Sequence, residues 1–272
     1  MEWVLLMSIG LVAGTIGSLI GLGGGVIIVP AILYFGSMAM LLDLSPQQAV
    51  GTSLIIMIFT GLSSTLAYMK YKTVDYKSGW IFFIGSGPGG IAGAYVNRIL
   101  NMESFQVYFG IFMIITALIL MFRSKVKPLP AAGKGGIQRI FTEKNGQQLT
   151  YSFQPSQAIL IAFLIGFLSG IFGIGGGSLL VPAMILLFAF PPHVAVATSM
   201  FIIFLSAIIS SLTHVAFGHV VWLYALALIP GAWIGAKAGA YLNTKLKSKA
   251  LVSLLRIILI IIGIRLIYQG LA

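Results

Sequence analysis

The chain contains the same glycine-rich turn twice. It reads Gly-Leu-Gly-Gly-Gly-Val-Ile-Ile-Val-Pro over residues 21–30 and Gly-Ile-Gly-Gly-Gly-Ser-Leu-Leu-Val-Pro over residues 173–182. Glycine is a poor helix former and has no side chain to pack, so each copy interrupts a long apolar run. Where a helix resumes after the turn, its first amides lack intrahelical partners and its dipole is positive, which favours an anion. We therefore expect two anion-binding turns that face each other.

Backbone amides of these turns are the first candidate ligands. They belong to the consecutive glycines of each turn and to the serine after the second set: Gly23, Gly24, Gly25, Gly175, Gly176, Gly177 and Ser178. Such glycines also allow close packing of membrane helices, which is the alternative interpretation. We favour a binding site, because paired interrupted helices at corresponding positions mark the substrate site of transporters. A nucleotide-binding loop is excluded, since no Gly-Lys-Ser/Thr follows either turn.

Hydroxyl groups are the second candidate ligands. Residues 46–53 read Pro-Gln-Gln-Ala-Val-Gly-Thr-Ser, and residues 192–199 read Pro-His-Val-Ala-Val-Ala-Thr-Ser. The hydroxyls near the start of these two helices could replace the water around an oxyanion; they belong to Thr52, Ser53, Thr198 and Ser199. Alternatively, each hydroxyl bonds to a carbonyl of its own helix.

Titratable groups are scarce inside the predicted helices. All five acids map to segment ends or loops, so a buried carboxylate relay for protons is missing. Gln47 and His193 occupy corresponding positions near the expected path of the anion. His193 either titrates near neutral pH and couples transport to protons, or serves as a polar cap. Lys237 lies inside a predicted helix, where it either pairs with the anion or extends to the membrane surface.

Catalytic and metal-binding patterns are absent from the sequence. The three histidines are scattered along the chain, and there is no cysteine to ligate a metal or form a disulfide. No acid pair, nucleophile elbow or zinc signature is present. We therefore predict neither an enzyme nor a bound metal or cofactor.

Composition determines the class of protein. Hydrophobic residues make up 59% of the 272 residues and charged residues 8%, and the mean hydropathy is +1.06. A soluble domain cannot bury so much apolar surface, so we predict an all-α polytopic membrane protein. The net charge of +11 suggests nucleic-acid binding, but no aromatic-basic motif of such modules is present. The basic residues cluster between helices, where they set orientation in a lipid bilayer.

The order of segments predicts two halves. Apolar segments at 3–20 and 26–42 flank the first turn, with helices near 47–69, 78–97 and 104–123; segments at 156–172 and 177–190 flank the second, with helices near 192–215, 219–243 and 249–269. The predicted domains are an N-terminal transmembrane repeat (1–123), a basic cytoplasmic linker (124–155) and a C-terminal transmembrane repeat (156–272). Within the linker, residues 137–142 and 148–153 flank Asn145-Gly146, so the linker is either a β-hairpin or disordered.

Further matches support the repeat. Pro88-Gly89 matches Pro230-Gly231, and residues 93–97 match residues 239–243, which gives the second copy one extra helical turn between the two motifs. Several matches in the same order indicate homologous halves.

Charge predicts that the halves are inverted. The basic segments 70–77, 124–155 and 245–249 are all cytoplasmic only if each half has three full helices and one glycine-broken hairpin whose ends lie on the same side. The halves are then two inverted-topology repeats, both termini lie outside, and the site lies between the repeats.

The doubled Gly-x-Gly-Gly-Gly…Val-Pro turn, each followed by Ala-Val-x-Thr-Ser, resembles the TauE/SafE sulfite exporter family. The resemblance covers nearly the whole chain apart from residues 124–155. It implies a protein of the cytoplasmic membrane whose substrate is a small sulfur-containing or organic anion such as sulfite, a sulfonate or sulfoacetate. We therefore expect a secondary transporter that works by alternating access, with a passive anion channel or a structural membrane protein as alternatives. The expected partners are the anion and the bilayer, without nucleic acid, and a homodimer is left open.

Overall fold

The computed structural model describes residues 2–38, 44–121, 136–142, 148–246 and 248–271. Its first-half helices are α1 (Glu2–Ile20), α2 (Gly25–Met38), α3 (Pro46–Lys70), α4 (Tyr76–Asn97) and α5 (Met102–Met121). Two strands follow, β1 (Ile137–Thr142) and β2 (Gln148–Phe153). The second-half helices are α6 (Pro155–Phe172), α7 (Gly177–Leu186), α8 (Pro192–Ala216), α9 (Trp222–Asn243) and α10 (Ser248–Leu271). Among the described helices, five are long and apolar enough to cross a membrane, which agrees with an all-α polytopic membrane protein.

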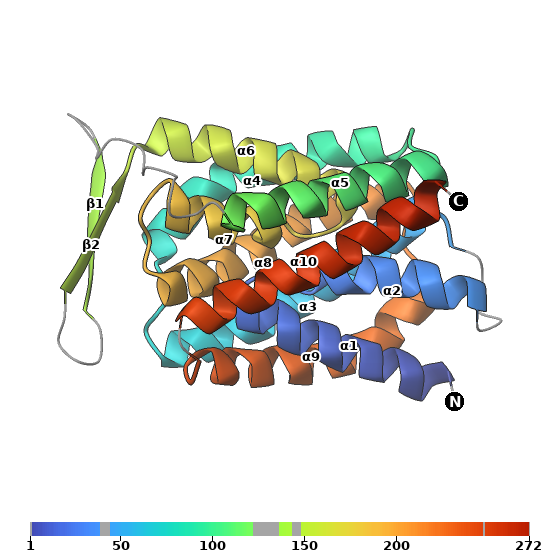
Figure 1. Cartoon of the computed structure of the whole chain (residues 1–272), viewed down its shortest axis with the longest axis horizontal. Helices are drawn as coiled ribbons and strands as arrows, with labels where there is room; N and C mark the ends of the chain where they lie inside the picture. The colour runs from blue at the N-terminus through green and yellow to red at the C-terminus, as the bar shows by residue number, and fades with distance from the viewer. Residues whose placement is uncertain (1, 39–43, 122–135, 143–147, 247, 272) are drawn as a thin grey trace.

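The glycine turns lie at the middle of the helix bundle. In Figure 1, α1 runs from one end of the bundle toward its middle, and α2 returns to that same end. The helices α6 and α7 form a similar pair that enters from the opposite end, where the two strands lie. The start of α1 and the end of α10 lie at the end farthest from the strands. Each turn therefore lies deep between helices, where an irregular backbone must be enclosed by protein or face a wet cavity.

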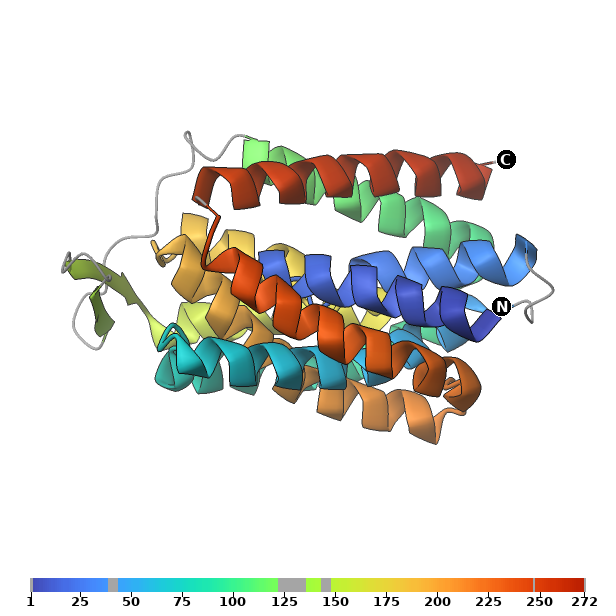
Figure 2. The ribbon, with the colours of Figure 1, turned by 90° about the horizontal axis from the view of Figure 1, so that it is seen from below.

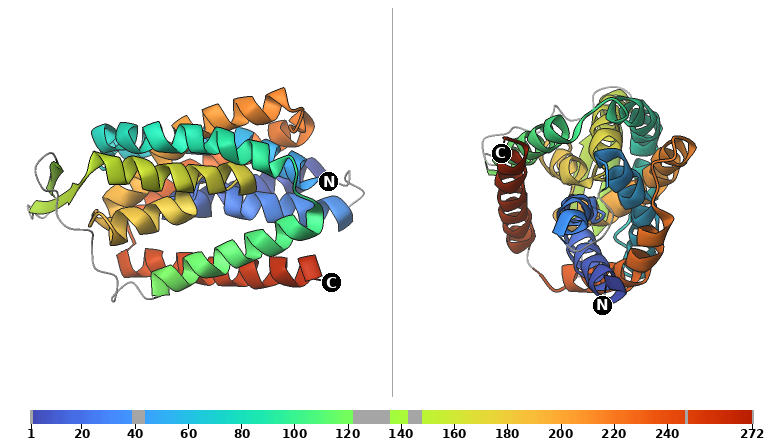
Figure 3. Two further views of the ribbon diagram at one scale, coloured as in Figure 1. Left: turned by 90° about the horizontal axis from the view of Figure 1, so that it is seen from above. Right: turned by 90° about the vertical axis from the view of Figure 1, so that its right-hand side faces the viewer.

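The most extensive helix contacts join the two halves. Helix α1 of the first half packs along α9 of the second, and α6 of the second packs along α4 of the first. Helices α3 and α8 pack against each other and are the most deeply buried of the candidate spans. Helices α5 and α10 form a pair on one side of the molecule, as Figure 2 and the left panel of Figure 3 show. The core of the protein is therefore the interface between its halves.

A ladder of glycines allows the closest of these contacts. Side chains at Gly85, Gly89 and Gly93 of α4 would collide with the carbonyls of Ile159, Phe163 and Phe167 in α6. At Gly231, Gly235 and Gly239 of α9, side chains would collide with the carbonyls of Met7, Leu11 and Thr15 in α1. Glycines spaced by four residues thus bring two helix backbones together on each side.

This ladder corrects one sequence match. The contacts align Gly85 with Gly231, whereas the sequence comparison had paired Pro88-Gly89 with Pro230-Gly231. Both helices contain 22 residues, so the longer separation between the two motifs in the second copy reflects an earlier proline and not an inserted helical turn. The prolines simply lie one turn apart in two helices of equal length, because glycine contacts with the neighbouring helix, and not the prolines, determine the register.

Helices α3 and α8, which follow the glycine-broken hairpins, both begin with a proline. Ser45 caps α3 by accepting a hydrogen bond from the Gln48 amide, the Gln48 side chain bonds back to Ser45, and Pro46 is the first helical residue. Helix α8 also has a proline, Pro192, as its first residue, but its N-cap residue Pro191 makes no side-chain cap hydrogen bond. These signals set where the Thr-Ser pairs of the two helices lie.

Within the linker, the structure shows two paired strands, as expected for a β-hairpin and not for a disordered segment. Strands β1 and β2 pair antiparallel, with Ile137 opposite Phe153 and Thr142 opposite Gln148. The Asn145-Gly146 turn predicted between them lies outside the described residues. Phe153 is buried against Phe188 and Phe190, which follow α7. Contacts with these aromatic rings hold the hairpin on one end of the bundle.

Helix α7 is shorter than the sequence predicts. It ends at Leu186, not near residue 190, because the chain turns back after it. Ala189 has a left-handed φ of 55°, and the Phe190 amide donates to the carbonyl of Met184 at 2.9 Å. This turn presents Phe188 and Phe190 to the hairpin.

Candidate functional site

The two glycine turns contact each other. Gly24 and Gly176 have left-handed φ values of 94° and 72°, which other residues rarely adopt. A side chain at Gly25 would collide with the carbonyl oxygen of Gly173, and a side chain at Gly177 would collide with that of Gly21. The turn of each half is therefore packed directly on the turn of the other half, as the sequence predicts, and no other residue type fits at the point of contact.

Two apolar side chains close the remaining space. Met57 of α3 and Ile203 of α8 both lie against Gly23 and Gly175. They are fully buried, as are all six candidate glycines. The turns are thus enclosed by protein in this conformation, with apolar side chains against Gly23 and Gly175.

Each turn is held by a serine of the other half. Ser53 Oγ donates to the carbonyl oxygen of Gly173 at 2.7 Å. Ser199 Oγ lies 3.1 Å from the carbonyl oxygen of Gly21, and it also donates within its own helix to Val196 at 2.8 Å. The structure therefore brings both predicted serines to the turns, and Ser199 additionally forms the within-helix bond that was the alternative interpretation.

Unpaired donors accompany the contact between the turns. The first bonds of the resuming helices come from Ile27 to Gly24 and from Leu179 to Gly176. The two amides before each of these donors, at residues 25–26 and 177–178, precede the first bond of their helix. The hydroxyl of Ser178 is fully buried and has no hydrogen-bond partner. These buried donors lie where two helices begin and where each helix dipole is positive.

The two threonines bond to the starts of the neighbouring helices. Thr52 Oγ1 accepts from the Val221 amide at 3.0 Å, and Thr198 Oγ1 accepts from the Asp75 amide at 3.0 Å. Val221 and Asp75 are the residues that cap α9 and α4. Both threonines are fully buried. Each threonine hydroxyl therefore bonds to the start of a helix of the other half, whereas the serine that follows it bonds to a glycine turn.

Gln47 and His193 lie at the starts of α3 and α8, and each contacts an asparagine that bonds to a residue just before a glycine turn. Gln47 Nε2 donates to the carbonyls of Asn97 and Leu100, and His193 Nδ1 lies 2.9 Å from Asn243 Oδ1. The amide groups of these asparagines donate in turn at 2.7 Å to Ile171 and Leu19, just before the glycine turns. The asparagines are positioning residues that the sequence analysis missed, although their repeated Gly-Ala-Tyr-x-Asn context was visible.

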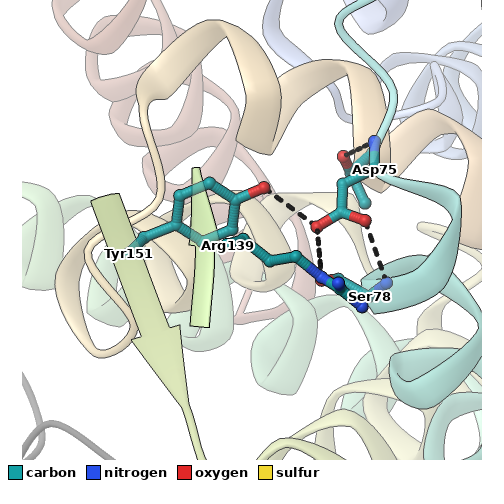
Figure 4. Close-up of polar contacts among 5 residues, drawn as sticks. Asp75, Ser78, Arg139 and Tyr151 are labelled. Carbon is teal, nitrogen blue, oxygen red and sulfur yellow. Dashed lines mark hydrogen bonds and ion pairs between the residues drawn. The ribbon is translucent and has the colours of Figure 1, made fainter. Parts of the chain in front are cut away.

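Asp75 joins the hairpin to the bundle (Figure 4). Its carboxylate accepts from the Ser78 amide at 3.1 Å, from the Ser78 hydroxyl and from the Tyr151 hydroxyl at 2.9 Å. Arg139 Nε lies 3.8 Å away. Burial, followed by the negative charge of Asp75, raises the pKa of the Tyr151 phenol, which therefore stays a donor. The Asp75 amide donates to Thr198 Oγ1, so Asp75 contacts both the hairpin and a candidate ligand of the anion.

Lys237 lies away from the glycine turns. Its side chain is exposed and lines a cavity of about 730 Å³ between α3 and α9, together with Lys70 and Tyr241. This exposed placement favours the second alternative, a cation that extends to the membrane surface, which stays a prediction.

A histidine pair is the second feature that the sequence analysis missed. The Nδ1 atoms of His214 and His219 are 3.4 Å apart, and Gly51, next to Thr52, packs against both residues. The signal in the sequence was a spacing of five residues around Gly218, whose left-handed φ of 71° folds His219 back on the end of α8.

Comparisons with known proteins assign the chain to a family. Residues 6–266 match the model of the family described as sulfite exporter TauE/SafE. The chain is 60% identical to the probable membrane transporter protein YunE of Bacillus subtilis (strain 168), over 99% of both chains. It is 28% identical to the probable membrane transporter protein MJ0441 of Methanocaldococcus jannaschii, over 96% of this chain and 93% of that one. No solved structure matches. The chain therefore belongs to the sulfite exporter TauE/SafE family and is a multi-pass membrane transporter, not an enzyme.

Proposed function

We propose that this protein is a secondary transporter that moves a small sulfur-containing anion, of the sulfite, sulfonate or sulfoacetate class, across the cytoplasmic membrane by alternating access. The observation that carries the proposal is the direct contact between the two glycine turns, one from each half. Each turn ends in a helix N-terminus, so the positive ends of two helix dipoles lie at the contact between the turns, each against a carbonyl of the other turn.

The chemistry of the turns suits an oxyanion. The described contacts of the turns involve hydroxyls, backbone carbonyls and apolar groups and no carboxylate, so no full negative charge there repels an anion. The carbonyl oxygens of Gly21 and Gly173 accept hydrogen bonds from Ser199 and Ser53. The amides at residues 25–26 and 177–178 and the hydroxyl of Ser178 are donors, and a sulfur oxyanion offers only acceptors. The name of the family adds sulfite as a member of the substrate class.

The buried turns support alternating access. All six candidate glycines are buried, and Met57 and Ile203 lie against Gly23 and Gly175, so we propose that an anion reaches the turns when the halves separate at one end. We propose that the halves work as inverted repeats and rock about the contact between their turns. The bonds from Ser53 and Ser199 cross this interface and keep the turns together while the ends open.

A thermal-shift screen of the purified protein tests the site. Sulfite, sulfate, thiosulfate, sulfoacetate, taurine and simple carboxylates are each added at millimolar concentration. At least one sulfur oxyanion raises the unfolding temperature of the wild type, and Ser178→Ala reduces that shift. Absence of any shift with the whole panel contradicts the anion site. Saturable counterflow in vesicles then distinguishes a transporter from a passive channel.

A further inference from the structure

His214 and His219 form a buried pair at the end of the bundle away from the hairpin. His214 is 0% exposed in the last turn of α8, and its Nε2 atom lies 3.3 Å from the carbonyl oxygen of Gly170. His219 follows the turn at Gly218 and is only partly buried. The His219 amide donates to the His214 carbonyl at 2.9 Å, which holds the two rings together.

Hydrogen-bond roles in the pair follow from its neighbours. The Gly170 carbonyl can only accept, so Nε2 of His214 carries a hydrogen and its Nδ1 carries a lone pair. Nδ1 of His219 then donates to Nδ1 of His214 across 3.4 Å. The lone pair that remains is on Nε2 of His219, on the more exposed ring of the pair. An additional proton from solvent therefore has one place to bind.

The pair is one helix layer from the second glycine turn. A side chain at Gly51 of α3 would collide with the carbonyl of His219 and lie 3.2 Å from Cβ of His214. On the other side of the same stretch, Ser53 bonds to Gly173. Gly170, which accepts from His214, belongs to the last turn of the helix that leads into this glycine turn. A charge on the pair is thus close to the proposed anion.

Burial and the nearby positive charge of Arg98 favour the neutral form of His219 when no anion is bound. The described groups around it are Gly170 of α6, Gly51 of α3, the Phe217 ring and Arg98, which lies over that ring at 5.3 Å. None of these is a carboxylate. Burial, followed by the positive charge of Arg98, lowers the pKa of His219. An anion at the glycine turns would offset both effects, so proton binding and anion binding favour each other.

The first half has no corresponding histidine that could bind a proton. At the position in α3 that corresponds to His214 stands Tyr68, whose hydroxyl donates to the carbonyl of Ser18 at 2.7 Å. A phenol that donates in this way has no basic nitrogen to take up a proton. Tyr68→Phe therefore supplies a control that removes the corresponding hydrogen bond to α1 without removing a group that binds a proton near neutral pH.

We propose that His214 and His219 form the proton-binding site that couples anion transport to the proton gradient, an inference that rests on the proposed function. A proton from solvent binds Nε2 of His219, the Nδ1 proton of His219 passes to Nδ1 of His214, and the charge is then on His214 with both of its nitrogens protonated. The reverse transfer releases one proton when the anion leaves.

Reconstituted vesicles test the coupling. Two activities are measured with radiolabelled sulfite, sulfate and sulfoacetate: exchange at equal pH, and accumulation driven by a gradient between about pH 6 and about pH 8, the range in which histidine titrates. His214→Gln and His219→Gln reduce the ratio of accumulation to exchange to that of vesicles without a pH gradient. Tyr68→Phe keeps the wild-type ratio. Every variant meets the same anions, so titration of the anion itself cancels.

The outcomes separate the two proposals. Wild-type ratios in both histidine variants overturn the proton site while leaving the transporter intact. No exchange of any of these anions by the wild type overturns the proposed function, and the coupling with it. If a variant does not fold, nitrogen-15 NMR of the wild-type histidines in the presence of sulfate decides the matter. One proton shared by the two rings is expected, and independent titration of each ring contradicts the pair.

Discussion

Ser53 Oγ donates a hydrogen bond to the carbonyl oxygen of Gly173, 2.7 Å away and 120 residues later in the chain. The bond joins a helix of the first half to the broken segment of the second, and Ser199 makes the corresponding contact with Gly21. Both bonds are buried, so each glycine carbonyl depends on a hydroxyl from the opposite half.

Removing these hydroxyls leaves the carbonyls with fewer partners. Ser53→Ala is expected to destabilise the protein by about 1–3 kcal/mol, the typical cost of a buried group that loses its partner. Ser199→Ala costs less, because that hydroxyl also bonds within its own helix. Thermal unfolding in detergent measures both effects. Ser8→Ala, which removes an exposed bond within α1, is the matched control and changes little.

Contact between the glycine turns leaves no room for a methyl group. Gly25→Ala and Gly177→Ala push the turns apart, with an expected loss of stability of about 1–3 kcal/mol and loss of the thermal shift by sulfur oxyanions. Gly87→Ala is the control, because an added methyl there meets only the Phe83 ring, at 3.2 Å or more. If Gly177→Ala keeps the full anion shift, the contact between the turns is not the binding site.

Besides its aromatic contacts, the hairpin is attached to the bundle by the hydrogen bond from the Tyr151 hydroxyl to Asp75. Tyr151→Phe removes the bond to the Asp75 carboxylate, and a hydrogen bond to a charged group contributes about 1.5–3 kcal/mol. Amide hydrogen exchange in β2 is expected to rise in this variant. Thr150→Ala, on the exposed side of the same strand, is the control. Unchanged exchange in Tyr151→Phe means that the aromatic contacts alone hold the hairpin.

The same bond gives an alkaline pH dependence. The pKa of Tyr151 is raised by burial, so the folded state favours the neutral phenol. This stabilisation is complete below the usual tyrosine pKa of about 10 and decreases as the pH rises above that value, because the unfolded phenol then ionises first. Hydrogen exchange in β2 should therefore increase above about pH 10 in the wild type and depend less on pH in Tyr151→Phe.

Acid destabilises the other end of the bundle. The pKa of His219 is lowered by burial and by Arg98, so the neutral ring is favoured in the folded state. The contribution to stability is complete above the usual histidine pKa of about 6.5 and decreases as the pH falls below it. Without added anion, the unfolding temperature should fall below that pH, and His219→Gln should weaken the fall. An equal fall in both proteins contradicts this assignment.

Single cysteines determine the orientation, because the chain contains none of its own. Helix α4 runs from the hairpin end of the bundle to the opposite end, as the left panel of Figure 3 shows. Lys77, in a basic segment, lies in its first turn, and Ile99, which is 81% exposed, follows its last turn, so we replace each by cysteine. A membrane-impermeant thiol reagent added to intact cells is expected to label Ile99→Cys only. Labelling of Lys77→Cys alone would reverse the predicted topology and place both termini in the cytoplasm.

The sequence alone determined the class of protein and predicted which segments face each other between the two halves. Hydropathy identified a helical membrane protein, and the duplicated turns and Thr-Ser pairs located the residues that meet in the core. These conclusions were within reach because they depend on local composition and on repeats along the chain. The family resemblance depended on the same residues.

The tertiary structure decided which residues pair across the halves. Helix packing decides whether a serine such as Ser199 bonds to its own helix or to the opposite turn. It also decides that His214 meets His219 and that Gln47 meets Asn97. The register of α4 and α9 was read wrongly from their prolines, because glycine contacts with α6 and α1 set it. Contacts between segments more than a hundred residues apart have no local signature. They follow from close packing of backbones that only the folded chain brings together.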